Sequence, residues 1–172
     1  MTTPMMNDKP VTDESEAAKK YAARLVGGRD YGMNDLVAKL SEKYSERSSV
    51  EAAVYMRDCG YVNDARYAEK LAERYITVRK YGRSRAALMM RQKLLDEQTI
   101  EEALSRYTKD DIEAEIADIL RKKYRGRLFL EGDAGKKEMQ KVIAALARRG
   151  YGYSNIKAAL YTVREELESE EE

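Results

Sequence analysis

The chain of 172 residues has 32 basic and 31 acidic side chains, one cysteine and two prolines, and it contains neither histidine nor tryptophan. The missing histidine excludes imidazole catalysis and histidine-bound metals, and a lone cysteine forms neither an internal disulfide nor a multi-cysteine metal site. No apolar run approaches the roughly 18 residues that span a bilayer, and the polar N-terminus does not resemble a secretory signal. We therefore expect a cytoplasmic protein with no membrane segment.

Apolar residues recur at intervals of three and four after Val11, and both prolines precede that residue. This spacing places each apolar set on one face of a helix, so it predicts an all-α protein. The predicted helices form three groups of three, at about 15–28, 34–44 and 48–58, about 64–80, 84–94 and 99–107, and about 110–124, 136–148 and 154–168.

These groups predict three tandem three-helix repeats, at residues 15–62, 63–109 and 110–168, with a loop at 126–135 lengthening the third. A flexible tail (1–14) and an acidic tail (169–172) flank them. Repeats of this size bury little core alone, so we expect them to stack into an elongated, curved array within a monomer.

Polar residues mark the predicted helix starts. Three pairs have capping-box spacing, namely Asp13 with Glu16, Thr99 with Glu102, and Asp110 with Glu113, and Asn63 or Asp64 is an N-cap candidate.

A pattern of a base, a tyrosine and a glycine recurs at the predicted helix ends, at residues 29–32, 79–82, 123–126 and 149–152. The base complements the negative end of the helix dipole, and the tyrosine packs against the cap. The motif thus has a structural interpretation, and its repetition also supports tandem units.

Charge is arranged in blocks along the chain. Residues 64–93 carry nine bases and three acids. Residues 94–118 carry two bases and nine acids, and residues 119–150 carry ten bases and three acids. Two interpretations remain open. The blocks neutralise one another across the repeats, or the basic blocks contact phosphates or acidic protein surfaces.

The sequence contains no motif for catalysis or cofactor binding. It lacks a phosphate-binding glycine loop, and acidic pairs such as Asp110–Asp111 lie at predicted helix starts, where capping accounts for them. Cys59, near Val50 and Val54, is expected to be half-buried rather than a nucleophile. We predict no catalytic residue, no metal, no cofactor and no enzyme activity.

Three stretches together resemble the RecX family of recombinase regulators. They are residues 58–68 (DCGYVNDARYA) continuing to 79–85 (RKYGRSR), residues 29–32 (RDYG) with Leu36 and Lys39-Leu40, and residues 141–151 (KVIAALARRGY) with 156–160. The resemblance covers about residues 17–165. The chain departs from the family at Leu94 and at residues 43–45, where the family has glycine turns, and in its longer 126–135 loop.

The resemblance implies three three-helix repeats that bind the RecA recombinase filament on DNA and inhibit its ATPase, strand-exchange and coprotease activities, thereby modulating DNA repair and the SOS response. It also allows weak, sequence-indifferent contact with DNA. From the charge blocks we predict that the residues contacting RecA or DNA are Arg74, Arg79, Lys80, Arg83, Arg85, Lys122, Lys123, Arg125, Arg148 and Arg149.

The alternative is a stand-alone DNA-binding protein of helix-turn-helix type. A short helix at 84–94 would then read bases through Arg83, Arg85, Arg91 and Gln92. The apolar residues in the middle of that segment indicate a core position instead.

Overall fold

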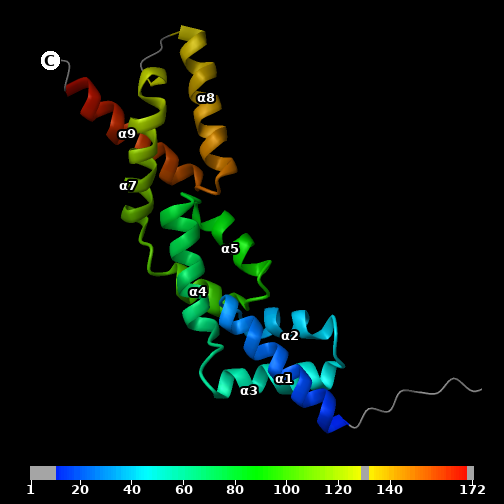
Figure 1. Cartoon of the computed structure of the whole chain (residues 1–172). Coiled ribbons are helices and arrows are strands. Elements are labelled where there is room, and N and C mark those ends of the chain that lie inside the picture. The colour runs from blue at the N-terminus through cyan, green and yellow to red at the C-terminus, as the bar shows by residue number, and fades with distance from the viewer. Residues whose placement is uncertain (1–10, 129–131, 170–172) are drawn as a thin grey trace, which may run out of the picture. The chain divides into compact units, whose positions relative to one another are not determined.

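The computed structural model describes residues 11–128 and 132–169 (Figure 1). Within these ranges the chain forms helices and turns and no strand, so the prediction of an all-α protein is confirmed. The α-helices are α1 (Val11–Gly28), α2 (Met33–Ser41), α3 (Glu46–Asp58), α4 (Asp64–Glu73), α5 (Arg83–Arg91), α6 (Glu97–Leu104), α7 (Lys109–Ile119), α8 (Gly132–Arg148) and α9 (Tyr153–Ser169). Two π-helices, η1 (Arg74–Val78) and η2 (Leu120–Tyr124), continue α4 and α7, and a 3₁₀ helix, η3 (Arg125–Arg127), follows. None of the described helices is both long and apolar enough to cross a membrane.

Helices α1 and α8 begin four residues earlier than predicted. Helix α1 begins at Val11, so residues 11–14 of the predicted tail are helical, and residues 1–10 lie outside the described part. Helix α8 begins at Gly132, so the second half of the predicted 126–135 loop is helical, and residues 129–131 lie outside the described part. Acidic residues in each first turn favour these starts through the helix dipole. Residues 170–172 of the predicted acidic tail also lie outside.

The capping box predicted at Asp110 and Glu113 is wrong by two residues. Helix α7 instead begins after Thr108, whose hydroxyl accepts a hydrogen bond from the Asp111 N–H at 3.2 Å. The Asp111 carboxylate accepts one from the Thr108 N–H at 2.9 Å. Either pair satisfies the spacing rule, and the pair that forms is the one whose first residue has extended backbone.

The other predicted caps give mixed results. Helix α6 begins at Glu97, and Asp96 accepts a hydrogen bond from the Thr99 N–H at 2.9 Å, so Thr99 is not the cap. Asp13 lies inside α1, so it is not the N-cap that the sequence predicted. Of the two N-cap candidates Asn63 and Asp64, Asn63 is the cap, because its side-chain oxygen accepts a hydrogen bond from the Arg66 N–H at 2.9 Å.

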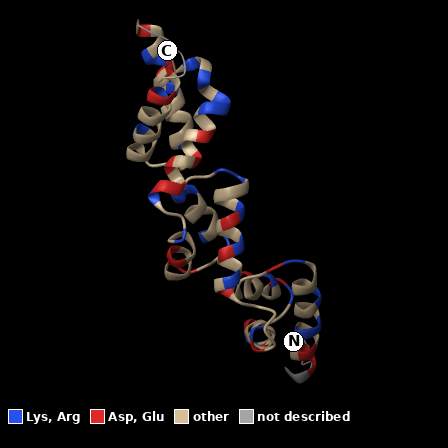
Figure 2. Ribbon diagram, turned by 90° about the vertical axis from the view of Figure 1, so that its left-hand side faces the viewer, with Lys and Arg blue, Asp and Glu red and all other residues tan. Residues whose placement is uncertain are grey.

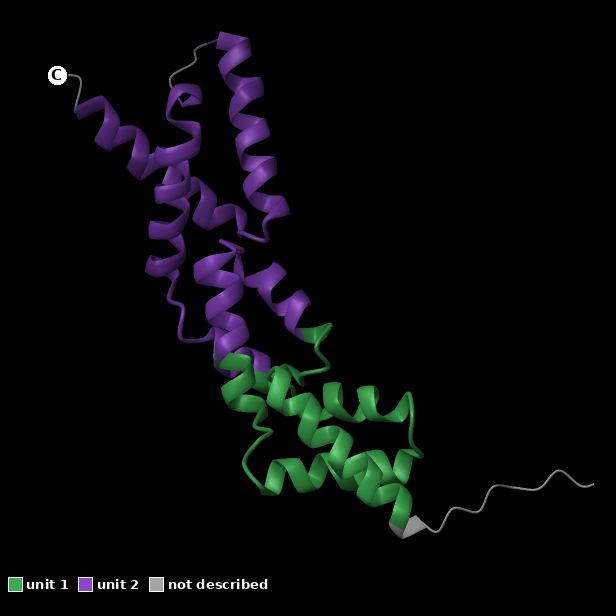
Figure 3. Ribbon diagram, in the orientation of Figure 1, with its two compact units in different colours: residues 1–69, 91–99 green, residues 70–90, 100–172 purple. Residues whose placement is uncertain are grey.

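The chain divides into two compact units (Figure 3). Within the described part, unit 1 comprises residues 11–69 and 91–99, and unit 2 comprises residues 70–90, 100–128 and 132–169. The division passes through the second of the three predicted repeats, residues 63–109. The repeat boundaries themselves stay a prediction.

Unit 1 is built on α3, against which both α1 and α2 pack. Alanines at the contact between α1 and α3 leave room for the two backbones to approach, and larger side chains from α2 fill the rest of the core. The buried residues are Ala18, Ala22, Tyr31, Leu36, Leu40, Ala52, Ala53, Met56 and Val62.

Helix α1 also caps α3 through Glu14. The Glu14 carboxylate accepts hydrogen bonds from the Ser45 N–H (3.0 Å), the Ser45 hydroxyl (2.7 Å) and the Ser48 hydroxyl (2.9 Å). These bonds lower the pKa of Glu14, the Ser45 hydroxyl most strongly. A side chain from one helix thereby satisfies the Ser45 N–H at the start of another and holds Ser45, whose own hydroxyl accepts from the Ser48 N–H as the N-cap of α3.

The two departures from the family's glycine turns have different outcomes. Leu94 takes the left-handed conformation itself, with φ of 58°, and its carbonyl accepts a hydrogen bond from the Asn34 side-chain amide at 3.2 Å. Between α2 and α3 no described non-glycine residue has positive φ, so that turn does not need glycine.

Unit 2 has its core where α7, η2, α8 and α9 meet, with α7 packed closely along α9. Its fully buried side chains recur at helical spacing, as the sequence predicts. They include Ile116, Leu120, Leu128, Val142, Leu146, Ile156 and Val163.

Cys59 is exposed, which corrects the prediction of a half-buried residue. It follows α3 as its C-terminal cap, where the chain turns toward Gly60, and so the helical periodicity that relates it to Val50 and Val54 ends before it.

Candidate interaction site

Two of the tyrosine–glycine turns lie against each other in unit 2, at Gly82 and Gly150. The Gly82 N–H donates to the carbonyl of Arg149 at 2.8 Å. A Cβ atom on Gly82 would lie 2.2 Å from the Gly150 carbonyl carbon, and one on Gly150 would lie 2.5 Å from the backbone nitrogen of Arg85. Gly150 also has φ of 88°. The close backbone approach therefore requires glycine in both turns.

Lys80 joins these turns to α7. Its backbone has φ of 56°, and its carbonyl accepts hydrogen bonds from the Arg149 guanidinium and the Tyr151 hydroxyl, both at 3.1 Å. Its ammonium pairs with Glu115 at 2.7 Å. Burial raises the pKa of Tyr151, and the Glu115 carboxylate raises it further, so the hydroxyl remains a proton donor near neutral pH.

A pocket of about 270 Å³ opens beside Lys80. Its walls come from the turn after η1, from α7 and η2, and from the end of α8. The structure brings four of the ten predicted contact residues together here, namely Lys80, Lys122, Lys123 and Arg149. The remaining lining residues are Glu115, Asp118, Ile119 and Tyr124.

Both carboxylates of this pocket are paired with a lysine. Lys80 holds Glu115, and Lys122 holds Asp118 at 2.9 Å. A second oxygen of Glu115 is buried without a hydrogen-bond partner in the described structure. These two pairs leave the other two cations of the pocket to determine its charge.

Neither Lys123 nor Arg149 has an ion pair with a described residue. The Lys123 ammonium lies 5.6 Å from the centre of the Tyr124 ring, and Arg149 donates to a backbone carbonyl. The lining therefore has an excess of two positive charges, and this arrangement attracts an anion.

Two further predicted residues adjoin the paired turns without lining the pocket. The Arg85 guanidinium lies 4.3 Å from the centre of the Tyr81 ring and donates to the Arg148 carbonyl at 3.1 Å. The Arg148 side chain is exposed. Stacking and hydrogen bonding hold Arg85 in place, because a planar guanidinium can do both.

The other four predicted residues lie elsewhere in unit 2. Arg83 pairs with Glu101 and donates to the carbonyl of Leu104 at 3.2 Å. Arg74, Arg79 and Arg125 are exposed, and the side chains of Arg74 and Arg79 have no ion pair within the described ranges. They are therefore not brought into the pocket.

Part of the charge is neutralised within the chain, which agrees with the interpretation that the charge blocks neutralise one another. Lys80 with Glu115 and Arg83 with Glu101 join the basic block at 64–93 to the acidic block that follows it. Figure 2 shows basic and acidic segments alternating along the ribbon. Internal pairing thus accounts for some predicted bases. Within the pocket, it leaves Lys123 and Arg149 without an ion pair to a described residue.

The sequence interpretation missed the carboxylates of the pocket. Glu115, Asp118 and Lys122 are spaced by three and four residues, so they lie on one face of the helix formed by α7 and η2. Counting charge in blocks assigned the acids and the lysine to different segments and hid this face.

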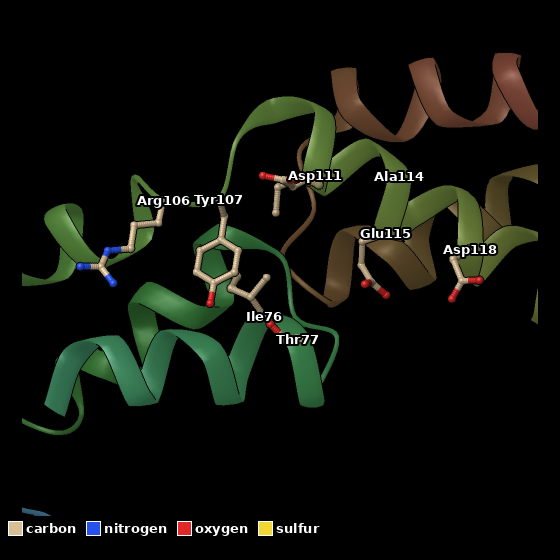
Figure 4. Close-up of a pocket in the computed structure, with 9 residues that line it drawn as sticks. Ile76, Thr77, Arg106, Tyr107, Asp111, Ala114, Glu115 and Asp118 are labelled. Atoms are coloured by element: carbon tan, nitrogen blue, oxygen red, sulfur yellow. The ribbon is translucent and has the colours of Figure 1, made fainter. Parts of the chain in front are cut away.

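A second pocket, of about 510 Å³, shares Glu115 and Asp118 with the first (Figure 4). The Tyr107 ring points toward Ile76 and Thr77 of η1, and the two carboxylates extend from α7. The described residues contain no group of three or more His, Cys, Asp or Glu side chains that could hold a metal ion. Asp111, a third acid in the lining, is engaged in the α7 cap.

Comparison with known proteins matches this chain to a family. The family model described as "RecX, second three-helix domain" matches residues 63–104, and the one described as "RecX, third three-helix domain" matches residues 110–160. The regulatory protein RecX of Vibrio parahaemolyticus is 30% identical over 146 residues, which are 84% of this chain and 90% of the relative. The regulatory protein RecX of Chromobacterium violaceum is 34% identical over 148 residues, which are 86% of this chain and 91% of the relative.

A solved structure shares the fold. The crystal structure of RecX from Lactobacillus salivarius aligns with a TM-score of 0.80 and 19% identity, covering 90% of this chain and 99% of that one. Fold and matched domains define an all-α protein built from three-helix domains. The resemblance found in the sequence is confirmed: the chain belongs to the RecX family.

Proposed function

We propose that this chain binds the RecA recombinase filament on DNA and inhibits its ATPase, strand-exchange and coprotease activities, thereby modulating DNA repair and the SOS response. Membership of the RecX family carries the proposal. The chain acts as a cytoplasmic monomer, by contact rather than by catalysis. Its relatives are named regulatory proteins.

The ten bases predicted from the sequence are the proposed contact surface for acidic parts of the filament or for DNA phosphate. Support comes from the pocket that gathers Lys80, Lys122, Lys123 and Arg149, and from the exposure of Arg74 and Arg79 without ion pairs in the described structure. Exposed, uncompensated charges steer association and set its salt dependence.

The helix-turn-helix alternative has less support. Ala86 and Met90 of α5 are buried, and the bases proposed to read DNA are engaged within the chain. Arg83 bonds to Glu101, Arg85 to the Arg148 carbonyl, and Arg91 to Glu97. Base reading by α5 would require breaking these contacts.

The test is co-sedimentation with RecA–single-stranded DNA filaments, together with an assay of RecA ATPase. We expect the wild-type chain to sediment with filaments and to inhibit the ATPase. Arg74→Glu combined with Arg79→Glu should raise the inhibitory concentration by about tenfold, because exposed charges of the contact surface are reversed.

Lys20→Glu with Arg47→Glu is the matched control, because it reverses two exposed bases of unit 1. Absence of the wild-type chain from sedimented filaments would contradict the proposed function. Equal inhibition by both double variants would contradict the assigned surface alone. Far-UV circular dichroism checks that each variant keeps its helices.

A further inference from the structure

We propose that the pocket lined by Lys80, Lys122, Lys123 and Arg149 binds a phosphate group of the DNA backbone. The inference rests on the proposed function and deepens it, because it names the component of the filament that this pocket contacts. It starts from the observation that residues from separate elements of unit 2 converge on one opening of about 270 Å³.

The pocket has a net positive charge. Glu115 and Asp118 are each paired with a lysine, at 2.7 and 2.9 Å, and these pairs offset the two carboxylates, although one Glu115 oxygen is buried without a hydrogen-bond partner in the described structure. Lys123 and Arg149 contribute two charges that no described carboxylate compensates. An anion entering the pocket therefore meets net attraction.

One donor of the pocket, the Arg149 guanidinium, is held in a fixed position. Arg149 uses one N–H group on the Lys80 carbonyl at 3.1 Å, and its backbone carbonyl accepts from the Gly82 N–H at 2.8 Å. The guanidinium has five N–H donors, so the others remain for a ligand while the first holds the group in place. A donor positioned in advance loses less entropy on binding.

A phosphate group fits this lining better than a carboxylate does. The lining cations come from three separate elements, which are the turn after η1, η2 and the end of α8. The oxygens of a tetrahedral phosphate point in several directions, whereas the two oxygens of a carboxylate share one plane. Donors that converge from several elements fit the tetrahedral group better.

The backbone and not the bases would bind, because the aromatic residue of the pocket is covered. Tyr124 is the aromatic residue in the lining, and it is only 9% exposed. A base cannot stack on a ring that is already covered. The contact is therefore electrostatic and indifferent to sequence.

The test measures binding of a fluorescent oligothymidylate of about 20 nucleotides by anisotropy, at salt concentrations between about 50 and 200 mM. Lys123→Gln should weaken binding about threefold and reduce the slope of log K against log salt by about 0.7, because one phosphate contact is lost. Adding Arg149→Gln should bring the loss to about tenfold and the slope change to about 1.4.

Lys20→Gln is the control, since it removes one exposed charge of α1. The single Lys123 variant keeps the experiment decisive if Arg149→Gln disturbs the turn, because Lys123 is exposed and makes only a ring contact within the described chain. An oligoglutamate peptide of equal length supplies carboxylates, and its binding should depend on the two residues less than oligothymidylate binding does, because carboxylates meet the same net charge without the tetrahedral fit.

If Lys123→Gln binds oligothymidylate with the same affinity and the same salt slope as Lys20→Gln, the phosphate assignment is overturned. It is also overturned if the wild-type chain shows no salt-dependent binding. An equal loss for oligoglutamate would also overturn it, in favour of an acidic protein surface. Co-sedimentation of the wild-type chain with RecA filaments tests the proposed function separately, and its failure would leave the oligonucleotide result unchanged.

Discussion

Two non-glycine residues of the described chain, Lys80 and Leu94, adopt left-handed backbone conformations, which cost an L residue about 1–2 kcal/mol. At Lys80 this conformation presents the carbonyl to two donors and the ammonium to Glu115. Leu94 makes one hydrogen bond through its carbonyl, and its side chain is 48% exposed. The strain at Leu94 is therefore the less compensated of the two.

We expect Leu94→Gly to stabilise the fold by about 0.5–1 kcal/mol, because relief of the left-handed strain exceeds the added entropy of an unfolded glycine. Urea unfolding followed by circular dichroism measures the change. Leu88→Gly is the control, since Leu88 is similarly exposed at 52% but lies within α5, where glycine should cost about 1 kcal/mol. Equal destabilisation by both changes would contradict the strain at Leu94.

Single residues show where prediction from sequence succeeded and where it failed. The left-handed turn at Leu94 could be located from the sequence, because the family has a glycine turn there. Leu94 adopts the left-handed conformation in place of that glycine. The conformation of Lys80 could not be predicted, because it depends on donors from Arg149 and Tyr151, which are distant in sequence. Exposure of Cys59 was missed because helical periodicity does not extend past the C-terminal cap.

At the scale of elements, hydrophobic periodicity was sufficient to predict the helices but not where they begin. The rule for capping boxes accepts both the Asp110–Glu113 and the Thr108–Asp111 pair, and only the backbone conformation decides between them. The π-helices η1 and η2 left no signal in the spacing of apolar residues. The Glu14 cap of α3 was missed because it joins separate helices.

The Glu14 cap makes the stability of unit 1 depend on pH. The folded state lowers the pKa of Glu14 from its ordinary value of 4.5, chiefly through the Ser45 hydroxyl. A carboxyl group with a lowered folded pKa stabilises the fold above its unfolded pKa, and this contribution is lost as the pH falls through the folded pKa. Glu14→Gln should therefore lower the melting temperature at pH 7, with a difference from wild type that shrinks below pH 4.5.

Thermal melts of both proteins between neutral and acidic pH check this prediction. Glu73→Gln is the control, since Glu73 is exposed at the end of α4 and has no hydrogen bond or ion pair with the described residues. If the melting temperature of Glu14→Gln stays below that of wild type by the same amount at acidic pH, the cap does not depend on the charge of Glu14.

At the scale of the whole molecule, the near balance of 32 bases and 31 acids conceals a local excess of positive charge. Block counting predicted the bases of the pocket, because they lie in two basic segments. It could not predict that Lys80 is neutralised, since Lys80 meets Glu115 only when the chain folds, and it separated Lys122 from Asp118 although the two are four residues apart. Nor could it predict that Lys80 and Arg149 line one opening.

This distribution of charge predicts how the whole chain binds duplex DNA. The bases that would read sequence from α5 are bound within the chain, so contact should be with phosphates, and affinity should fall steeply with salt. We expect duplexes of unrelated sequence to bind within about threefold of one another, whereas specific recognition typically gives preferences of about a thousandfold or more. Repeated selection from a random-sequence duplex pool measures this directly. Enrichment of a common motif by the wild-type chain would contradict this expectation. If the same selection with Arg91→Ala no longer enriched the motif, α5 would be shown to read sequence.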